Sequence, residues 1–225
     1  MLNLSKKRSV GIILLLSVYS AVHIIYTKII SHSFDMPMQF SVSLQLVSYI
    51  VLGSAGFALF RTDIKEGIAL WKEHPNKNIG FLIGAYVLDI LLSNLALIPI
   101  NCINPDYQSI NEHSVAELQG KFPVLLLVIA LGIMGPVTEE ILFRLIPTCL
   151  TEKKSIKVIG LFVSAFLFML IHIQGFTVEE FLYNLPHLVS GVIYGTVTLM
   201  SRNVTIPILL HIMNNLPAVL FLMFS

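Results

Sequence analysis

Residues 122–145 read FPVLLLVIALGIMGPVTEEILFRL. This run is apolar over most of its length, and it is long enough for a helix to cross the ~30 Å hydrocarbon core of a bilayer. Three charged residues, Glu139, Glu140 and Arg144, nevertheless fall within it. An unpaired ionised side chain at the centre of a membrane costs about 2.5 to 3.5 kcal/mol or more. The stretch therefore predicts a membrane-spanning helix whose charged side chains serve chemistry.

The rest of the chain is similarly apolar. Of its 225 residues, 56% are hydrophobic and 12% are charged, and the mean hydropathy of +0.83 is not that of a soluble domain. We expect an all-α protein, a polytopic transmembrane helical bundle of about seven spans, forming one integral membrane domain over residues 1–225. The other six apolar runs of spanning length are Val10 to Ile30, Gln39 to Phe60, Ile79 to Ile100, Ile156 to Ile173, Phe181 to Met200 and Val204 to Phe224.

The first span follows three basic residues, as the apolar part of a secretory signal peptide does. Its apolar stretch exceeds the about 7 to 15 residues of such a signal, and no small-x-small cleavage site closes it. We therefore favour a retained helix.

The positions of Lys and Arg set the expected orientation, because these residues stay on the cytoplasmic side when they lie in short loops. A cytoplasmic N-terminus leaves only Lys28 and Lys121 outside, with Arg144 in the membrane. The bias predicts a multi-pass protein of the cell membrane with its N-terminus in the cytoplasm and its C-terminus outside. The net charge of +1 offers no basic field for nucleic acid. Eleven of the 14 Lys and Arg residues are then inside: Lys6, Lys7, Arg8, Arg61, Lys65, Lys72, Lys77, Lys153, Lys154, Lys157 and Arg202.

Two connecting segments carry a pattern. Ile64, Ile68 and Trp71 recur at helical spacing, as on a surface helix at the cytoplasmic interface. The alternative, which we favour, is a solvated connector anchored by Trp71. Residues 101–121 form the longest non-apolar segment. They can cap an outer opening or form a plain loop, and we favour the loop. Within the fourth span, the Gly135-Pro136 pair predicts a kink just before the two glutamates.

The two adjacent glutamates are expected to have different tasks. Neighbours on a helix diverge by about 100°, so Glu139 and Glu140 should not point at one reacting atom. Glu140 and Arg144 are separated by four residues, and they can neutralise each other on one face. This leaves Glu139 as the free carboxylate, able to take a proton from water.

Two later spans each add a histidine with a partner on the same helix face: Phe168 with His172, and His211 with Asn215. Counted from the inner ends of their helices at ~1.5 Å per residue, Glu139 lies about 16 Å deep, His172 about 22 Å and His211 about 10 Å. We expect the three to share one cavity that opens to the cytoplasm.

Other buried polar residues favour structural roles. We expect His23 and His187 to be hydrogen-bonded between helices. Asp89, alone in the third span, can contact Arg144 or Asn94, or line the cavity, and the structural role is favoured.

The motifs EExxxR, FxxxH and HxxxN, in this order on separate predicted helices, resemble those of the CAAX-protease and bacteriocin-processing family of intramembrane proteases, which includes the type II CAAX prenyl endopeptidases. The resemblance covers residues 122–225, the expected catalytic core, and gives no inference for the first three spans. The matching residues are Glu139, Glu140 and Arg144, then Phe168 and His172, then His211 and Asn215.

The resemblance implies an intramembrane endopeptidase that hydrolyses a peptide bond within or beside the membrane. Glu139 would activate water, His172 would help to position it, and His211 with Asn215 would stabilise the oxyanion. The neighbouring Glu140 and Arg144 would hold the helix and orient Glu139.

Two chemistries remain open. Glu139, His172 and His211 can form a three-ligand zinc site with an open position for water, although the HExxH spacing of soluble zinc proteases is absent. The alternative is water activation by glutamate and histidine without metal. We favour the metalloprotease class by name, with the ion itself unproved.

The expected partners are the lipid bilayer and a membrane-associated peptide or protein. Bacterial family members are linked to peptide or bacteriocin maturation and self-immunity, and we favour these roles over prenyl-protein trimming. One alternative is a catalytically silent scaffold or immunity protein that binds a bacteriocin or a sensor protein, but binding alone does not require an unpaired intramembrane carboxylate. A proton-coupled transporter using Asp89 and the site residues is less favoured, because the sequence has no evident repeat.

Overall fold

The computed structural model describes residues 6–30, 38–118, 120–149 and 153–224. These residues form helices joined by short turns, with no strand in the described ranges. The expected all-α class is therefore confirmed. The elements are α1 (Lys6–Tyr19), η1 (Ser20–Ile30), α3 (Met38–Leu59), α4 (Arg61–Glu73), α5 (Pro75–Ala96), α6 (Ile98–Ile103), α7 (Ile110–Ala116), α8 (Val124–Leu127), η2 (Val128–Met134), α9 (Gly135–Glu140), η3 (Ile141–Leu145), α10 (Ile146–Cys149), α11 (Lys154–His172), α12 (Val178–Tyr183), α13 (Leu185–Ser201) and α14 (Thr205–Phe224).

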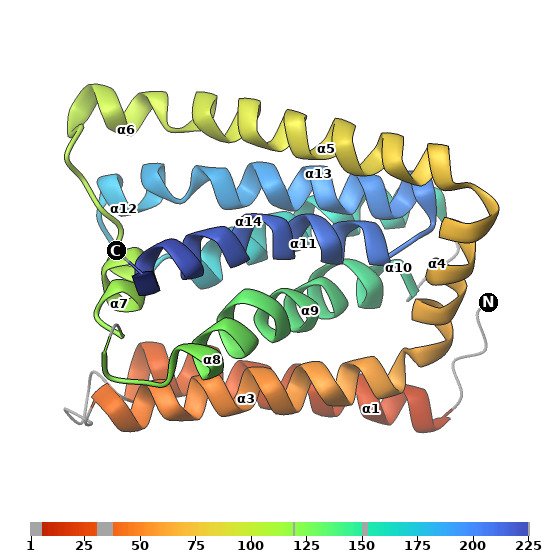
Figure 1. The fold of residues 1–225 in the computed structure, drawn as a ribbon, viewed down its shortest axis with the longest axis horizontal. Helices are drawn as coiled ribbons and strands as arrows, with labels where there is room; N and C mark the ends of the chain where they lie inside the picture. Colours follow the sequence, from red (N-terminus) through yellow and green to blue (C-terminus); the bar gives the residue numbers. More distant parts are fainter. Residues whose placement is uncertain (1–5, 31–37, 119, 150–152, 225) are drawn as a thin grey trace.

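The long helices run along one axis of the molecule, and successive ones point in opposite directions (Figure 1). By length and composition, α14 is a shorter apolar helix and five described segments are able to cross a membrane. Together with α13, the five segments and α14 match the expected bundle of about seven spans. The five segments are Arg8–Tyr26, Gln39–Leu59, Pro75–Ile103, Val124–Thr148 and Lys154–His172.

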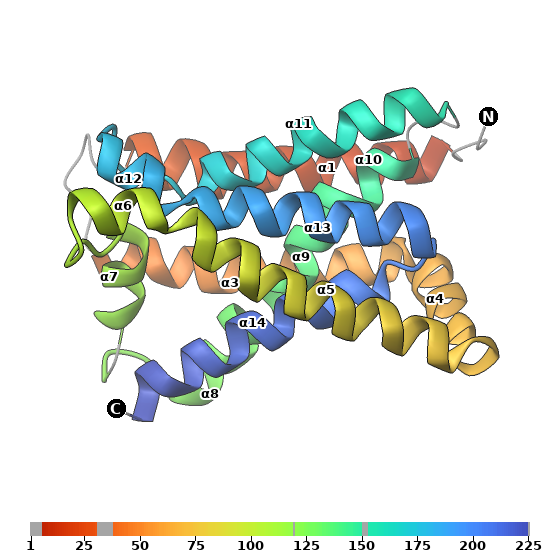
Figure 2. The ribbon, with the colours of Figure 1, turned by 90° about the horizontal axis from the view of Figure 1, so that it is seen from above.

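The helix α13 lies in the middle of the bundle, between α5 and α11 (Figure 2). Two glycines allow this close packing. A Cβ atom at Gly191 would lie 2.8 Å from the Cβ of Ala165, and one at Gly195 would lie 2.8 Å from the Cγ of Leu161. Small residues spaced by four are a usual device for bringing membrane helices together. The close contact fixes the polar face of α13 against the site.

The fourth span is built from five consecutive helical segments, α8 to α10. Its α-helical segment α9 lies between two π-helical segments, η2 and η3. Pro136 occupies the first turn of α9, where a missing N–H is tolerated. All six residues of α9 are buried, so the two glutamates lie inside the bundle.

One end of the bundle is covered by α4, as the spacing of Ile64, Ile68 and Trp71 predicts (Figure 1). Ile64 is buried in the core. The indole N–H of Trp71 donates to the hydroxyl of Thr205 at 2.8 Å, which ties α4 to the start of α14. Arg8 on α1 pairs with Asp63 at 2.6 Å. The segment is thus a helix that covers one end of the bundle, and its cytoplasmic location stays a prediction.

The opposite end holds α6, α7 and α12 (Figures 1 and 2). The segment favoured as a plain loop thus contains helices, and it is pinned to the bundle by the fully buried Glu180. Its carboxylate accepts hydrogen bonds from the Tyr107 hydroxyl at 2.7 Å, the Ile110 N–H at 3.3 Å and the Gln174 N–H at 3.1 Å. This segment forms part of a cavity wall, as described below.

Candidate active site

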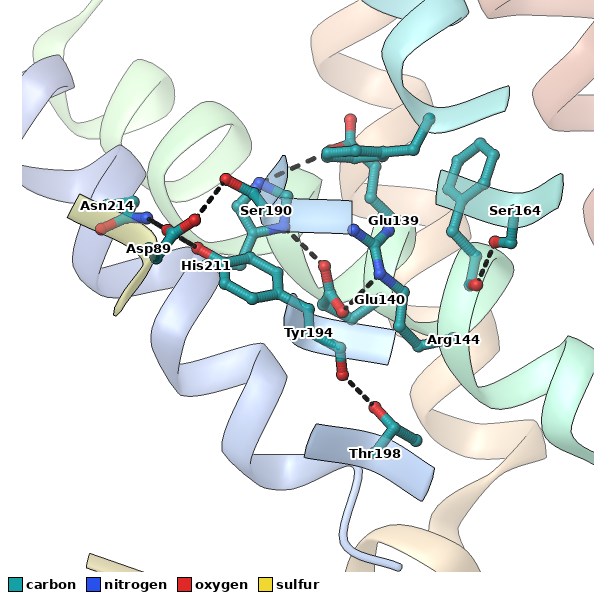
Figure 3. A network of polar contacts seen from close by, with 12 residues as sticks. Asp89, Glu139, Glu140, Arg144, Ser164, Ser190, Tyr194, Thr198, His211 and Asn214 are labelled. Carbon is teal, nitrogen blue, oxygen red and sulfur yellow. Dashed lines mark hydrogen bonds and ion pairs between the residues drawn. The ribbon is translucent and has the colours of Figure 1, made fainter. Parts of the chain in front are cut away.

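Two carboxylates on α9 and an imidazole on α14 form the centre of a buried polar cluster (Figure 3). The Nδ1 atom of His211 lies 2.9 Å from Oε1 of Glu140, and its Nε2 atom lies 3.7 Å from Oε2 of Glu139. The three residues are at most 5% exposed. One imidazole thus contacts both carboxylates through its two nitrogens.

This arrangement corrects the expected division between the glutamates. Their directions diverge, but an imidazole ring carries nitrogen atoms on two sides, so Glu139 and Glu140 both reach His211. Nor is Glu139 without a partner, because the hydroxyl of Tyr49 on α3 donates to its Oε1 at 2.8 Å.

Arg144 lies beneath this cluster and is 2% exposed. Its Nε atom is 3.3 Å from Oε2 of Glu140, an ion pair that matches the prediction. The guanidinium also stacks over the ring of Phe168 at 4.2 Å, a favourable cation–π position. The rings of Phe168 and His211 are nearly perpendicular, with 5.7 Å between their centres. Phe168 therefore packs against both the guanidinium of Arg144 and the imidazole of His211.

His172 lies at the C-terminal end of α11, in the cavity wall. Its Nδ1 atom is 2.8 Å from the carbonyl oxygen of Phe168. Its ring stacks on His187 at 3.9 Å. His187, expected to bridge helices, instead lines the cavity beside His172. His23 meets the expectation, because it lies 2.6 Å from the Ser48 hydroxyl on α3.

Asp89 on α5 is 2% exposed and forms the far edge of the network (Figure 3). Its carboxylate accepts hydrogen bonds from Ser190 at 2.7 Å, Tyr194 at 2.9 Å and Asn214 at 2.6 Å. These bonds join α5, α13 and α14, so the favoured structural role fits, but the partners are not the expected Arg144 or Asn94. Asn215, the neighbour of Asn214, lines the cavity.

The cavity above this network has a volume of about 880 Å³, within the range of small-molecule and peptide sites. Its buried lining residues include Glu139, Phe168, Tyr194 and His211, which form its floor. Its exposed lining residues belong to the α7 segment and the end of α14, far from α4. The cavity therefore opens at the α7 end, and the expected opening to the cytoplasm stays a prediction. Counting residues along each helix gives the depth of a site residue in the membrane, but it does not show at which end of the bundle the cavity is open.

The three predicted zinc ligands do not form a ready-made metal-binding group in the described residues. Within those ranges, no three His, Cys, Asp or Glu side chains come together as a group able to hold a metal ion. Both ring nitrogens of His211 face carboxylates, and His172 is stacked on His187 in the wall. The proposed ligands Glu139, His172 and His211 share a cavity without forming a coordination shell, so metal binding stays a prediction.

The sequence analysis did not identify several residues that belong to the site and its polar network. Tyr49 looks like an ordinary aromatic in an apolar span, and no local pattern connects it to Glu139. Ser190 and Tyr194 had a usable signal, because they lie four residues apart on one face of a predicted span.

Comparison with known proteins adds one finding. Residues 121–217 match the family model described as type II CAAX prenyl endopeptidase, Rce1-like. Comparisons with curated proteins and with solved structures gave no match. The matched segment holds all seven motif residues, from Glu139 to Asn215, and it agrees with the resemblance that the motifs indicated. Residues 121–217 are therefore similar to the Rce1-like type II CAAX prenyl endopeptidase family.

Proposed function

We propose that the protein is an intramembrane endopeptidase in which Glu139 activates a water molecule. One observation carries the proposal: Oε2 of Glu139 and Nε2 of His211 are 3.7 Å apart at the buried floor of a large cavity. This gap is too long for a direct hydrogen bond. It suits a water molecule that bridges both atoms.

In the proposed reaction, Glu139 takes a proton from this water, and the resulting hydroxide attacks the carbonyl carbon of the scissile bond. The carbonyl oxygen becomes an oxyanion, which His211 and the amide of Asn215 would stabilise. When the C–N bond breaks, Glu139 returns its proton to the leaving amine. All atoms and charges are then accounted for without a further reactant.

The surrounding residues would hold the reacting groups in place. Glu140 accepts the Nδ1 hydrogen of His211 and directs Nε2 towards Glu139. Arg144 balances the charge of Glu140, and Tyr49 orients Glu139 through its hydroxyl. His172, higher in the wall, would contact the substrate or position the water.

We propose a membrane-associated peptide or protein as the substrate, with bacterial peptide or bacteriocin maturation, or self-immunity, as the biological setting. The setting rests on the motif resemblance, and the polar cavity floor inside an apolar bundle supports the membrane location of the substrate.

We also propose a cell-membrane location with the N-terminus in the cytoplasm. Support comes from the basic residues on α4, at the start of α5 and at the start of α11, which gather at one end of the bundle (Figures 1 and 2). Basic side chains favour the cytoplasmic face.

The test compares cells that produce the natural protein with cells that produce Glu139→Gln. Mass spectrometry of membrane fractions should find peptides with new termini only with the natural protein. Glu66→Gln, which changes an exposed carboxylate on α4, is the matched control and should behave like the natural protein. Identical peptide profiles for the natural protein and Glu139→Gln, at equal protein levels, would favour the silent scaffold instead.

A further inference from the structure

The cavity has a closed end and an open end. Its floor residues Glu139, Phe168, Tyr194 and His211 are each 5% exposed or less. The lining residues that are exposed include Gln108, His113 and Glu117 around α7, together with Phe221 on α14. Since the exposed lining lies at one end of the bundle, a substrate reaches the floor from that end.

The rim is polar on its α7 side, whereas α14 adds the exposed Ala218 and Phe221. Gln108 and Gln174 line the cavity beside His113 and Glu117, which approach each other to 3.4 Å. Charged and amide side chains are costly against lipid tails and are well solvated by water. The opening therefore faces an aqueous phase or a headgroup layer.

The basic residues gather at the opposite end, and none of them lines the cavity. Arg61, Lys65 and Lys72 lie on α4, and all three are exposed. The start of α11 adds the exposed Lys154, and the turn after α13 adds the exposed Arg202. At the open end, Lys121 is the exposed basic residue of the α7 to α8 connection. The positive-inside bias thus assigns the closed end to the cytoplasm.

We infer that the cavity opens on the extracytoplasmic side of the membrane, and that the substrate is a peptide segment presented at the outer leaflet or beyond it. A prenylated tail in the cytoplasm would face the closed end and could not reach Glu139. The substrate part of this inference rests on the proposed peptidase function, whereas the side of the opening does not.

The way the rim is held supports a permanent opening at this end. Glu180 fixes both flanks of the entrance, because it binds Tyr107 before α7, Ile110 at the start of α7 and Gln174 after α11. The rim is thereby attached to the bundle through a buried carboxylate and does not lie across the floor.

Cysteine labelling tests the inference. In a background with Cys102 and Cys149 replaced by serine, single cysteines are introduced as Gln108→Cys at the rim, Gln45→Cys in the cavity wall and Lys72→Cys on α4. Intact spheroplasts are treated with a membrane-impermeant maleimide, before and after permeabilisation. The cysteines at positions 108 and 45 should be labelled in intact spheroplasts, and the one at position 72 only after permeabilisation.

The reverse pattern would overturn the inference. A position 45 that stays unlabelled in both states, in a protein that elutes as a folded monodisperse species, would also overturn it, because the wall would then have no water access. Should Gln45→Cys fail to fold, the exposed position 108 still decides the side of the opening. Labelling needs no catalysis, so external labelling together with unchanged peptide profiles for Glu139→Gln would reject the peptidase and leave the opening established.

Discussion

Replacement of Glu140 by glutamine should destabilise the protein strongly. Glu140 is 0% exposed and is paired with Arg144, which is 2% exposed. Glutamine keeps the shape of the side chain, and its amide oxygen can still accept a hydrogen from His211. The change therefore removes mainly the charge. Loss of one partner from a buried ion pair costs about 3 to 5 kcal/mol, because the other charge stays buried.

For a chain of this size, each kcal/mol lowers the melting temperature by about 2 to 4 °C. Glu140→Gln should therefore lower Tm in detergent by about 6 to 20 °C. The fluorescence of the single tryptophan, Trp71, is a suitable probe, since its indole is tied to α14 through Thr205. Loss of this contact on unfolding should change the emission.

Two variants separate charge from shape. Glu117→Gln, in an exposed pair with Lys121 at 3.8 Å, should change stability by less than about 1 kcal/mol. The double variant Glu140→Gln with Arg144→Met should recover much of the lost stability, because no charge is then stranded. A Tm for Glu140→Gln equal to that of the natural protein, or a double variant less stable than the single one, would refute the reasoning.

Three further predictions concern the reaction. Tyr49→Phe removes the hydroxyl that binds Glu139, a hydrogen bond to a charged group worth about 1.5 to 3 kcal/mol, so kcat should fall about 10- to 100-fold with little change in KM. The control is Tyr26→Phe, because the hydroxyl of Tyr26 lies 3.5 Å from Ser41. An unchanged kcat for Tyr49→Phe would show that Tyr49 does not position the base. If His172 and His211 serve one step, the double alanine variant should retain about the residual peptide cleavage of His211→Ala alone, whereas multiplicative losses would place them in separate roles. Chelators that enter the cavity should leave cleavage unchanged if no metal takes part, while loss with recovery on added zinc would establish the metal.

The spans could be predicted because burial in lipid leaves a local signature in the sequence. An apolar run of about twenty residues is rare outside membrane-spanning helices, and the end-to-end order of the long helices follows from their short connections. The helix α4 could also be predicted, because Ile64, Ile68 and Trp71 recur with the helical period. What these signals share is that each belongs to one continuous stretch of chain.

The contacts inside the site could be predicted only in part for the same reason. Glu140 and Arg144 lie on one helix, and spacing alone pairs them. Tyr49 meets Glu139 across two helices, because α3 and the fourth span approach closely at Gly53, where an added Cβ would lie 2.7 Å from the Cε atom of Met134. This close approach depends on how the surfaces of the two helices pack together, and the sequence of neither helix alone predicts it.

The first three spans, for which motifs gave no role, contribute two polar side chains to the site, the partly buried Tyr49 and the buried Asp89. Tyr49 from α3 supports Glu139, and Asp89 from α5 holds Tyr194 and Asn214. The ring of Tyr194 lies 5.7 Å from the Arg144 guanidinium and 5.9 Å from the ring of His211. The residues that match the family model, 121–217, are thus positioned by side chains outside that segment. The N-terminal spans therefore complete the site as well as the membrane domain.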